Sequence, residues 1–194
     1  MIDRPWRCFW AVPLPDNLRA SLAVAVAEMR ADPLVDAGWR WADPDGWHVT
    51  LAFLGAVAPN SVPALLASVS AEVRDEPAFT VDGGGLGGFP SGRRARVLWY
   101  GISDEDGLLR GLAARVARAS GLPDGGPFRG HVSLARSRDR NGAHAPAPPP
   151  GGLPIASMDV RDITLYRSHL GQGPARYEAL GTALLAAPAP VPAR

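Results

Sequence analysis

The chain of 194 residues carries 20 basic and 19 acidic side chains, which gives a net charge of +1 at pH 7. This balance provides no strong overall field toward nucleic acid or an anionic membrane, and a chain of this length and 46% hydrophobic content can bury the core of one domain without staples. All 20 basic residues are arginine, whose planar guanidinium suits phosphate better than an ammonium group does.

The first half of the chain predicts strands and helices in alternation. Short apolar runs that end at proline or glycine predict strands, and apolar residues that recur every three or four positions predict helices. The predicted elements are a strand at 8–14, a helix that begins at Asp16 or Asn17, an extended segment at 38–43, a turn at 44–46, a strand at 47–55 and a helix that begins at Ser61.

The second half repeats this alternation and then becomes rich in proline and glycine. The predicted elements are a short strand at 79–81, a strand at 96–102, a helix at about 106–120, a strand at 131–136, an exposed loop at 137–154, a strand at 158–166, a glycine-rich turn at 169–177 and a last strand at about 177–185. Residues 186–194, a run of alanine and proline, predict a disordered tail.

The order of these elements predicts an α+β fold with two similar lobes in a single domain, residues 1–185. Two strands, at 47–55 and at 131–136, each follow a helix of similar length, and this is a weak internal repeat. In such a fold the helices pack outside and the sheets line a shared central cleft.

The cysteine content and the apolar runs bear on the compartment. Cys8 is the only cysteine, so no internal disulfide can form, which fits a reducing cytoplasm. The first 15 residues lack the long apolar segment of a signal peptide, and no apolar run approaches the ~20 residues of a membrane span. We therefore expect a cytoplasmic, monomeric protein that does not enter a membrane.

Histidine and a hydroxyl residue, two positions apart, occur twice in strand-like sequence. The first copy is His48 and Thr50 in WHVTLAFLG. In a strand, residues i and i+2 point to one face, so these two share a face while Val49, Leu51 and Phe53 are expected on the other.

The second copy is His131 and Ser133 in GHVSLARSR, 83 positions after the first. If the lobes face each other, two imidazoles and two hydroxyls converge. One imidazole can act as a base and the other as an acid near neutral pH, and the hydroxyls can donate to phosphate oxygens as charge develops. This set of groups is suited to phosphoryl transfer without a metal.

These motifs resemble those of the two-histidine (2H) phosphoesterase superfamily, and within it the RNA 2′,3′-cyclic phosphodiesterases, also known as the LigT or 2′-5′ RNA ligase-like group. The resemblance rests on WHVTLAFLG and PFRGHVSLAR and extends to RCFWAVPLPDNLR, GGGLGGFPSGRRARVLWYGI and LYRSHLGQGPARYEAL. It implies a bilobal fold with antiparallel sheets and a central cleft. It also implies hydrolysis of RNA 2′,3′-cyclic phosphate ends to 2′-phosphomonoesters, and in some members a weak 2′-5′ ligation.

The resemblance also implies roles for the four motif residues. His131 would accept a proton from water, His48 would donate a proton to the leaving oxygen, and Thr50 and Ser133 would bind phosphate. Two departures from the family pattern are serine where threonine is usual, which removes the methyl that restricts the rotamer, and Gly130 where proline is common.

Several other patterns are assigned no catalytic role. The G-x-G-x-x-G match at 83–88 precedes Phe-Pro and a strand rather than a helix, so we interpret it as a turn. The sequence shows no phosphate-binding P-loop and no cluster of metal ligands, so we expect neither cofactor nor metal. His144 is expected on the surface. Arg93, Arg94 and Arg96 are expected at a solvated hairpin tip, with contact to an RNA backbone as the alternative. The tryptophans at 39, 41 and 47 are expected in packing, with base stacking by one of them as the alternative.

Four residues near the motifs keep open roles. Arg136 could neutralise phosphate, but strict alternation puts it on the face opposite His131, so a bulge or strand end would be needed. Tyr166, His169 and Arg176 flank a loop that could rim the cleft or simply shape the turn.

The sequence is compatible with three functions. The first is metal-independent hydrolysis of RNA 2′,3′-cyclic ends. The second is another 2H activity, either 2′-5′ ligation and cleavage or hydrolysis of a small cyclic nucleotide. The third is RNA binding without catalysis, which the intact histidines argue against. The expected partner is RNA or an oligonucleotide with a cyclic phosphate end.

Overall fold

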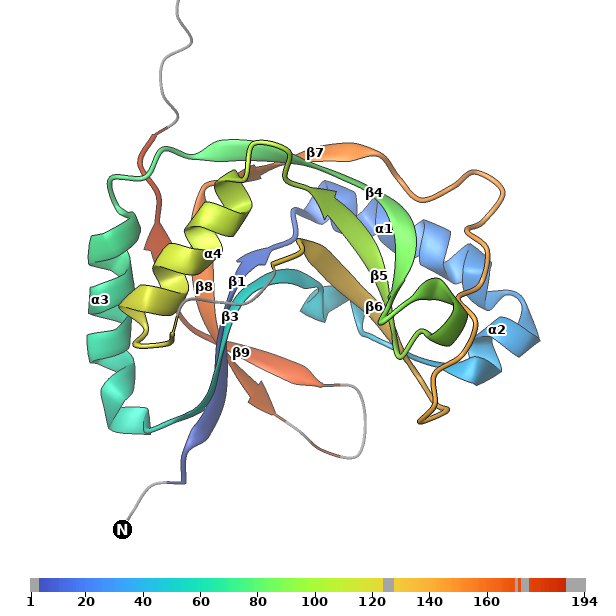
Figure 1. Ribbon diagram of the computed structural model, residues 1–194, viewed down its shortest axis with the longest axis horizontal. Coiled ribbons are helices and arrows are strands. Elements are labelled where there is room, and N and C mark those ends of the chain that lie inside the picture. The colour runs from blue at the N-terminus through green and yellow to red at the C-terminus, as the bar shows by residue number, and fades with distance from the viewer. Residues whose placement is uncertain (1–3, 124–127, 170, 172–174, 188–194) are drawn as a thin grey trace, which may run out of the picture.

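The computed structural model describes residues 4–123, 128–169, 171 and 175–187, and it has nine strands and four α-helices in this part of the chain (Figure 1). The strands are β1 (Trp6–Pro13), β2 (Trp39–Trp41), β3 (His48–Val57), β4 (Phe79–Phe89), β5 (Val97–Ser103), β6 (His131–Ser137), β7 (Ala156–Val160), β8 (Asp162–His169) and β9 (Arg176–Leu184). The helices are α1 (Asp16–Arg30), α2 (Pro33–Gly38), α3 (Val62–Val73) and α4 (Leu108–Ala119).

The strands form one curled antiparallel sheet with two similar halves (Figure 1). The order is β7-β4-β5-β6-β3-β1-β8-β9, and β2 lies beside β6. The two histidine-bearing strands, β3 and β6, are therefore the innermost strands of the two halves, and each has three further strands outside it. This arrangement confirms the α+β fold and the repeat expected from the sequence.

The helices bury the apolar stripes that predicted them. In α1 the buried side chains include Leu18, Leu22, Val26 and Met29. Helix α4 packs against α3 and against β3, so it covers the sheet close to the first motif. No helix among the described residues combines the length and apolarity needed to cross a membrane.

Helix α2 was not predicted. It is one and a half turns long and begins with Asp32 as its cap, whose carboxylate accepts a hydrogen bond from the Leu34 N–H at 2.8 Å. Pro33 occupies the first turn, where its missing N–H costs nothing. Asp32 and Pro33 are a helix-start signal that is visible in the sequence. The helix buries no side chain, however, so the apolar stripe that would have predicted it is absent.

The glycine-rich segment at 83–88 is strand rather than turn, so this prediction was wrong. Strand β4 runs through it and pairs with β5 as far as Phe89. A Cβ at Gly83 would overlap the ring of Tyr100, and one at Gly87 would overlap the ring of Trp99. The glycines therefore leave room for two large side chains of β5 to lie across the neighbouring strand.

The predicted strand at 158–166 is two strands that belong to opposite halves of the sheet. Strand β7 pairs with β4, and β8 pairs with β1, so the chain changes sides at Arg161. Near the C-terminus, Ala186 still exchanges backbone hydrogen bonds with Glu76 and Ala78, so order extends past the predicted boundary at 185. The rest of the predicted tail, from 188, and much of the predicted turn at 169–177 lie outside the described residues.

Candidate active site

The two histidine motifs meet where the halves of the sheet join. Val49 of β3 pairs with Val132 of β6 in antiparallel register. This register places His48 opposite Ser133 and Thr50 opposite His131. All four side chains are half-buried, whereas the two valines are buried on the other face. We call the face that carries the four motif side chains the histidine face.

Each imidazole is anchored by the backbone carbonyl two residues before it. His48 Nδ1 lies 2.7 Å from the Gly46 oxygen, and His131 Nδ1 lies 2.9 Å from the Arg129 oxygen. A carbonyl can only accept, so in both rings Nδ1 carries the hydrogen. The neutral form then has an unprotonated Nε2, which is the nitrogen that can take or give a proton in the site.

A β-bulge follows the hydroxyl residue in both motif strands. In β3 the extra residue is Leu51, directly after Thr50, as the pairing with β1 shows. In β6 it is Leu134, directly after Ser133, as the pairing with β5 shows. Each bulge shifts the alternation of side chains by one position, so residues beyond it change faces.

Phe53 lies beyond the first bulge, and its predicted position behind the motif was wrong. Its side chain is 47% exposed rather than buried with Val49. The ring is parallel to that of Phe9, with centroids 6.2 Å apart, and Phe9 in turn stacks on His48. Phe53 therefore extends the histidine face along β3.

Arg136 lies beyond the second bulge and is likewise brought to the histidine face. The side chain is exposed. Its charge adds to the effect of burial in lowering the pKa of His131, and it partly opposes the burial that raises the pKa of Tyr177 on β9. The bulge that the sequence interpretation required for Arg136 to reach the cleft is thus present.

Aromatic rings enclose both imidazoles. Phe9 stacks on His48 with centroids 4.7 Å apart, and Tyr177 meets its edge at 5.0 Å. On the other half, Phe89 contacts His131 edge-on at 4.9 Å. These rings displace water from the imidazoles, which weakens the charged form of each.

Burial accordingly lowers the pKa of both histidines. It lowers the pKa of His48 to about 4, against a partly opposing hydrogen bond to Gly46 and with a smaller contribution from His131. Burial also lowers the pKa of His131, and the charges of Arg129 and Arg136 lower it further. Both imidazoles are therefore neutral at pH 7 in the free protein, and both can act as bases.

Positive charge gathers on the side of His131. The Arg129 guanidinium lies 4.3 Å from the centroid of the Trp99 ring, and Trp99 pairs with Ser133 across the sheet. Arg136 approaches from the other end of β6. Two guanidinium groups beside a neutral imidazole favour an anionic ligand at this place.

A cavity of about 330 Å³ adjoins His48. Tyr166 and Arg176 line it, so these two side chains lie beside the candidate site. His169 Nε2 instead forms a hydrogen bond with the Glu178 carboxylate at 2.8 Å, and His169 belongs to the strand pairing of β8 and β9. The remaining residues that line the cavity are Asp43, Asp45, Gly46, Trp47, Ala175 and Tyr177.

Of the other candidates, Trp39, Trp47 and His144 lie where the sequence analysis expected them, and Trp41 does not. Trp39 and Trp47 are buried in the core, and His144 Nδ1 lies 2.9 Å from the carbonyl oxygen of Ala145, the next residue. Trp41 is half-buried and lines a neighbouring cavity of about 630 Å³.

Sequence reasoning missed Phe9, Phe89, Trp99 and Arg129 as neighbours of the histidines. Phe9 and Trp99 come from the strands beside the motif strands, Phe89 comes from β4, one strand further out, and Arg129 comes from the segment before β6. Only Arg129, two residues before His131, stood close enough in sequence to be noticed.

Comparison with known proteins agrees with this geometry. Residues 12–99 match the family described as LigT like Phosphoesterase. An RNA 2′,3′-cyclic phosphodiesterase of Thermus thermophilus is 35% identical over 84% of this chain and 82% of the relative. The chain belongs to the LigT-like phosphoesterase family.

Other relatives show the same likeness at the level of fold and sequence. The crystal structure of E. coli LigT complexed with phosphate matches with a TM-score of 0.72 and 29% identity, covering 95% of this chain and 99% of that one. An RNA 2′,3′-cyclic phosphodiesterase of Geobacillus stearothermophilus is 31% identical over 93% of this chain, which spans 58% of that relative's length. As in this family generally, the α+β fold presents a curled antiparallel sheet.

Proposed function

We propose that this LigT-like phosphoesterase hydrolyses the 2′,3′-cyclic phosphate at the end of an RNA to a 2′-phosphomonoester. The observation that carries the proposal is the pairing of the two motifs at Val49 and Val132, which brings two imidazoles and two hydroxyls onto one face. The names of the relatives supply the substrate class.

In the proposed reaction His131 Nε2 takes a proton from water, and the water oxygen forms a bond to phosphorus. The bond from phosphorus to the ribose O3′ breaks, and His48 gives a proton to that oxygen. Thr50 and Ser133 donate hydrogen bonds to the non-bridging oxygens, where negative charge grows. Arg136 adds a positive charge on the same side.

The electrostatics of the free protein support His131 as the base but do not by themselves make His48 an acid. Arg129 and Arg136 oppose protonation of His131, which suits a base. His48 has no such cationic neighbour among the causes of its lowered pKa, which is mainly due to burial. In the free protein a single shared proton would reside on His131, because its pKa is the less strongly lowered. The proposed roles require the bound phosphate anion to raise the pKa of His48 above that of His131.

Turnover of a 2′,3′-cyclic mononucleotide tests the proposal. The purified protein should convert it to the 2′-phosphate with chelator present, and product analysis by phosphorus NMR distinguishes the 2′- from the 3′-phosphate. Activity that returns only with an added divalent ion would contradict the metal-independent reaction. RNA binding without turnover of any cyclic substrate would favour a non-catalytic binding protein.

A further inference from the structure

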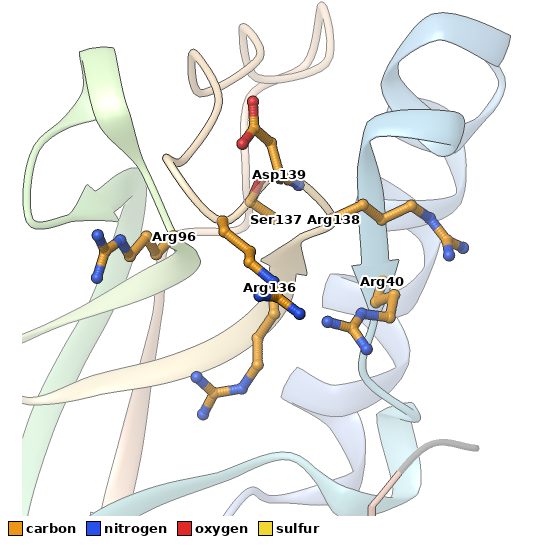
Figure 2. A pocket seen from close by; sticks show the side chains of 7 residues that line it. Arg40, Arg96, Arg136, Ser137, Arg138 and Asp139 are labelled. Carbon is orange, nitrogen blue, oxygen red and sulfur yellow. Dashed lines mark hydrogen bonds between the residues drawn. The ribbon is translucent and has the colours of Figure 1, made fainter. Parts of the chain in front are cut away.

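A third cavity, of about 540 Å³, lies at the far end of β6 from His131 (Figure 2). Five of the residues that line it are arginines, and only one is acidic. They come from β2, from the segment before β5 and from the end of β6 and the turn after it. The lining residues are Arg40, Arg96, Arg136, Ser137, Arg138, Asp139 and Arg140.

The sheet register brings these arginines together across adjacent strands. Arg40 of β2 is directly opposite Arg136 of β6, and the carbonyl of Arg96 accepts a hydrogen bond from the Ser137 N–H. Figure 2 shows Arg136 between Arg40 and Arg96. Like charges directly opposite each other in a sheet are destabilising, so this arrangement needs a reason other than stability.

Protein carboxylates do not neutralise this cluster. Among the residues that the structure describes, none of the five arginines takes part in an ion pair. On the outer helices the pattern is different, because Arg115 and Arg118 both approach Glu72. The carboxylate of Asp139 accepts a hydrogen bond from the Asn141 N–H in its own turn. The positive charge of the cavity is therefore available to an anion from outside.

The arginine cavity shares residues with the surroundings of the active site in two ways. Arg136 belongs to it and also acts on His131. Arg40 and Arg138 line the neighbouring cavity of about 630 Å³ as well, and that cavity shares Asp43 with the one beside His48. Half-buried Trp41 lines this connecting cavity and offers an aromatic surface.

The size of this surface points to a chain of phosphates. Because of the bulge at Leu134, Arg136 lies two ladder positions along β6 from Ser133, about 7 Å at roughly 3.3 Å per position, and Arg138 and Arg140 lie further on. A single phosphate group bound at the motif hydroxyls would therefore leave Arg138 and Arg140 without an anionic partner. Guanidinium groups spaced along a groove match successive phosphates of a single-stranded nucleic acid, and an aromatic side chain between them can stack a base.

We propose that the arginine cavity binds the RNA backbone on the 5′ side of the cyclic end, so that the protein prefers oligonucleotides to mononucleotides. This inference rests on the proposed function, because the cyclic phosphate at the 3′ end must occupy the histidine site. The phosphodiesters that precede it then run past Arg136 toward Arg40 and Arg138.

The test compares kcat/KM for a cyclic-ended tetranucleotide and a cyclic mononucleotide, in wild type and in the double variant Arg40→Gln, Arg138→Gln. Charged hydrogen bonds of this kind are expected to contribute on the order of tenfold each, so the variant should lose most of the tetranucleotide advantage and keep mononucleotide turnover. The slope of log affinity for the tetranucleotide 2′-phosphate against log salt should also fall by about 0.7 per lost contact.

Arg110→Gln is the matched control, because Arg110 is an exposed arginine on α4, which packs against β3 away from the arginine cavity. This control variant should leave kcat/KM unchanged for both substrates. Equal kcat/KM for the two substrates in wild type, or equal losses on both in the double variant, would overturn the role of the cavity and leave the proposed function standing. Failure to turn over any cyclic substrate would instead count against the proposed function itself.

Discussion

Val49 and Val132 face each other across the join between the two halves of the sheet, and both are buried. Each is flanked on both sides by a residue of its own motif. One pair of apolar side chains thus sets the register of all four polar groups. A one-residue slip of either strand at this pair would turn its two motif side chains away from those of the other strand.

The hydroxyls of the motifs should be needed for the chemical step. Thr50→Ala and Ser133→Ala should each lower kcat by ~10²–10³, because one donor to the developing phosphate charge is lost. Ser133→Thr keeps the hydroxyl and should retain activity. Steady-state kinetics on a cyclic mononucleotide checks this, and wild-type kcat in both alanine variants would show that the hydroxyls are structural.

The leaving group should distinguish the two histidines. His48→Ala should lose far more activity on a cyclic ester with an alkoxide leaving group than on one with an activated aryl leaving group, which needs no proton. His131→Ala should lose activity on both, because attack by water still needs a base. The reverse pattern would exchange the roles, and one histidine without effect on either ester would contradict an acid–base pair.

The pH dependence of kcat/KM reports on the free protein. The pKa of His48 is lowered to about 4, and that of His131 is also below its ordinary 6.5. Because one histidine must be neutral and the other charged, the plot of kcat/KM against pH should be bell-shaped. Its maximum should lie between pH 4 and pH 6.5 rather than at neutrality. In kcat the maximum should lie at higher pH, because the bound phosphate raises both pKa values.

Arg136→Gln provides a directional control for this profile. Removing that cation removes one cause of the lowered pKa of His131, so the pKa rises and the limb that it governs should move to higher pH. A shift of the same limb to lower pH would show that Arg136 does not act on His131.

Gly87 should be required for the packing of β4 on β5. Gly87→Ala would place a methyl group against the ring of Trp99 and should destabilise the protein by about 1–3 kcal/mol through overpacking. Gly111→Ala is the matched control, because nothing lies near that position in α4 and alanine favours the helix by about 1 kcal/mol. Thermal unfolding measures both, and tryptophan fluorescence reports on Trp99. Equal melting temperatures for Gly87→Ala and wild type would contradict the packing argument.

Much of the fold could be predicted from the sequence, because apolar periodicity marks buried faces. The helices at 16–30, 62–73 and 108–119 followed from their stripes, and the repeated motif indicated two similar halves. The long glycine-rich strand could not be predicted in this way. Its stability depends on the rings of Trp99 and Tyr100 from the next strand, which is a tertiary effect.

The four motif residues could be predicted as a site, but their surroundings could not. Strict alternation fails at Leu51 and Leu134, and no local signal marks a bulge in an apolar run. This is why Phe53 was assigned to the wrong face and why the face of Arg136 stayed open. Phe9 and Phe89 reach the histidines from separate strands, so only strand order could reveal them.

The backbone anchors at Gly46 and Arg129 have a consequence for motion. Each imidazole contacts a backbone carbonyl only two residues before it in the chain. The tautomer and the orientation of each ring are therefore set within a single tripeptide. If the two halves flex about their join, the gap between the Nε2 atoms changes while each ring keeps its proton on Nδ1. The orientation of each imidazole thus depends on its own strand and not on the distance between the two halves.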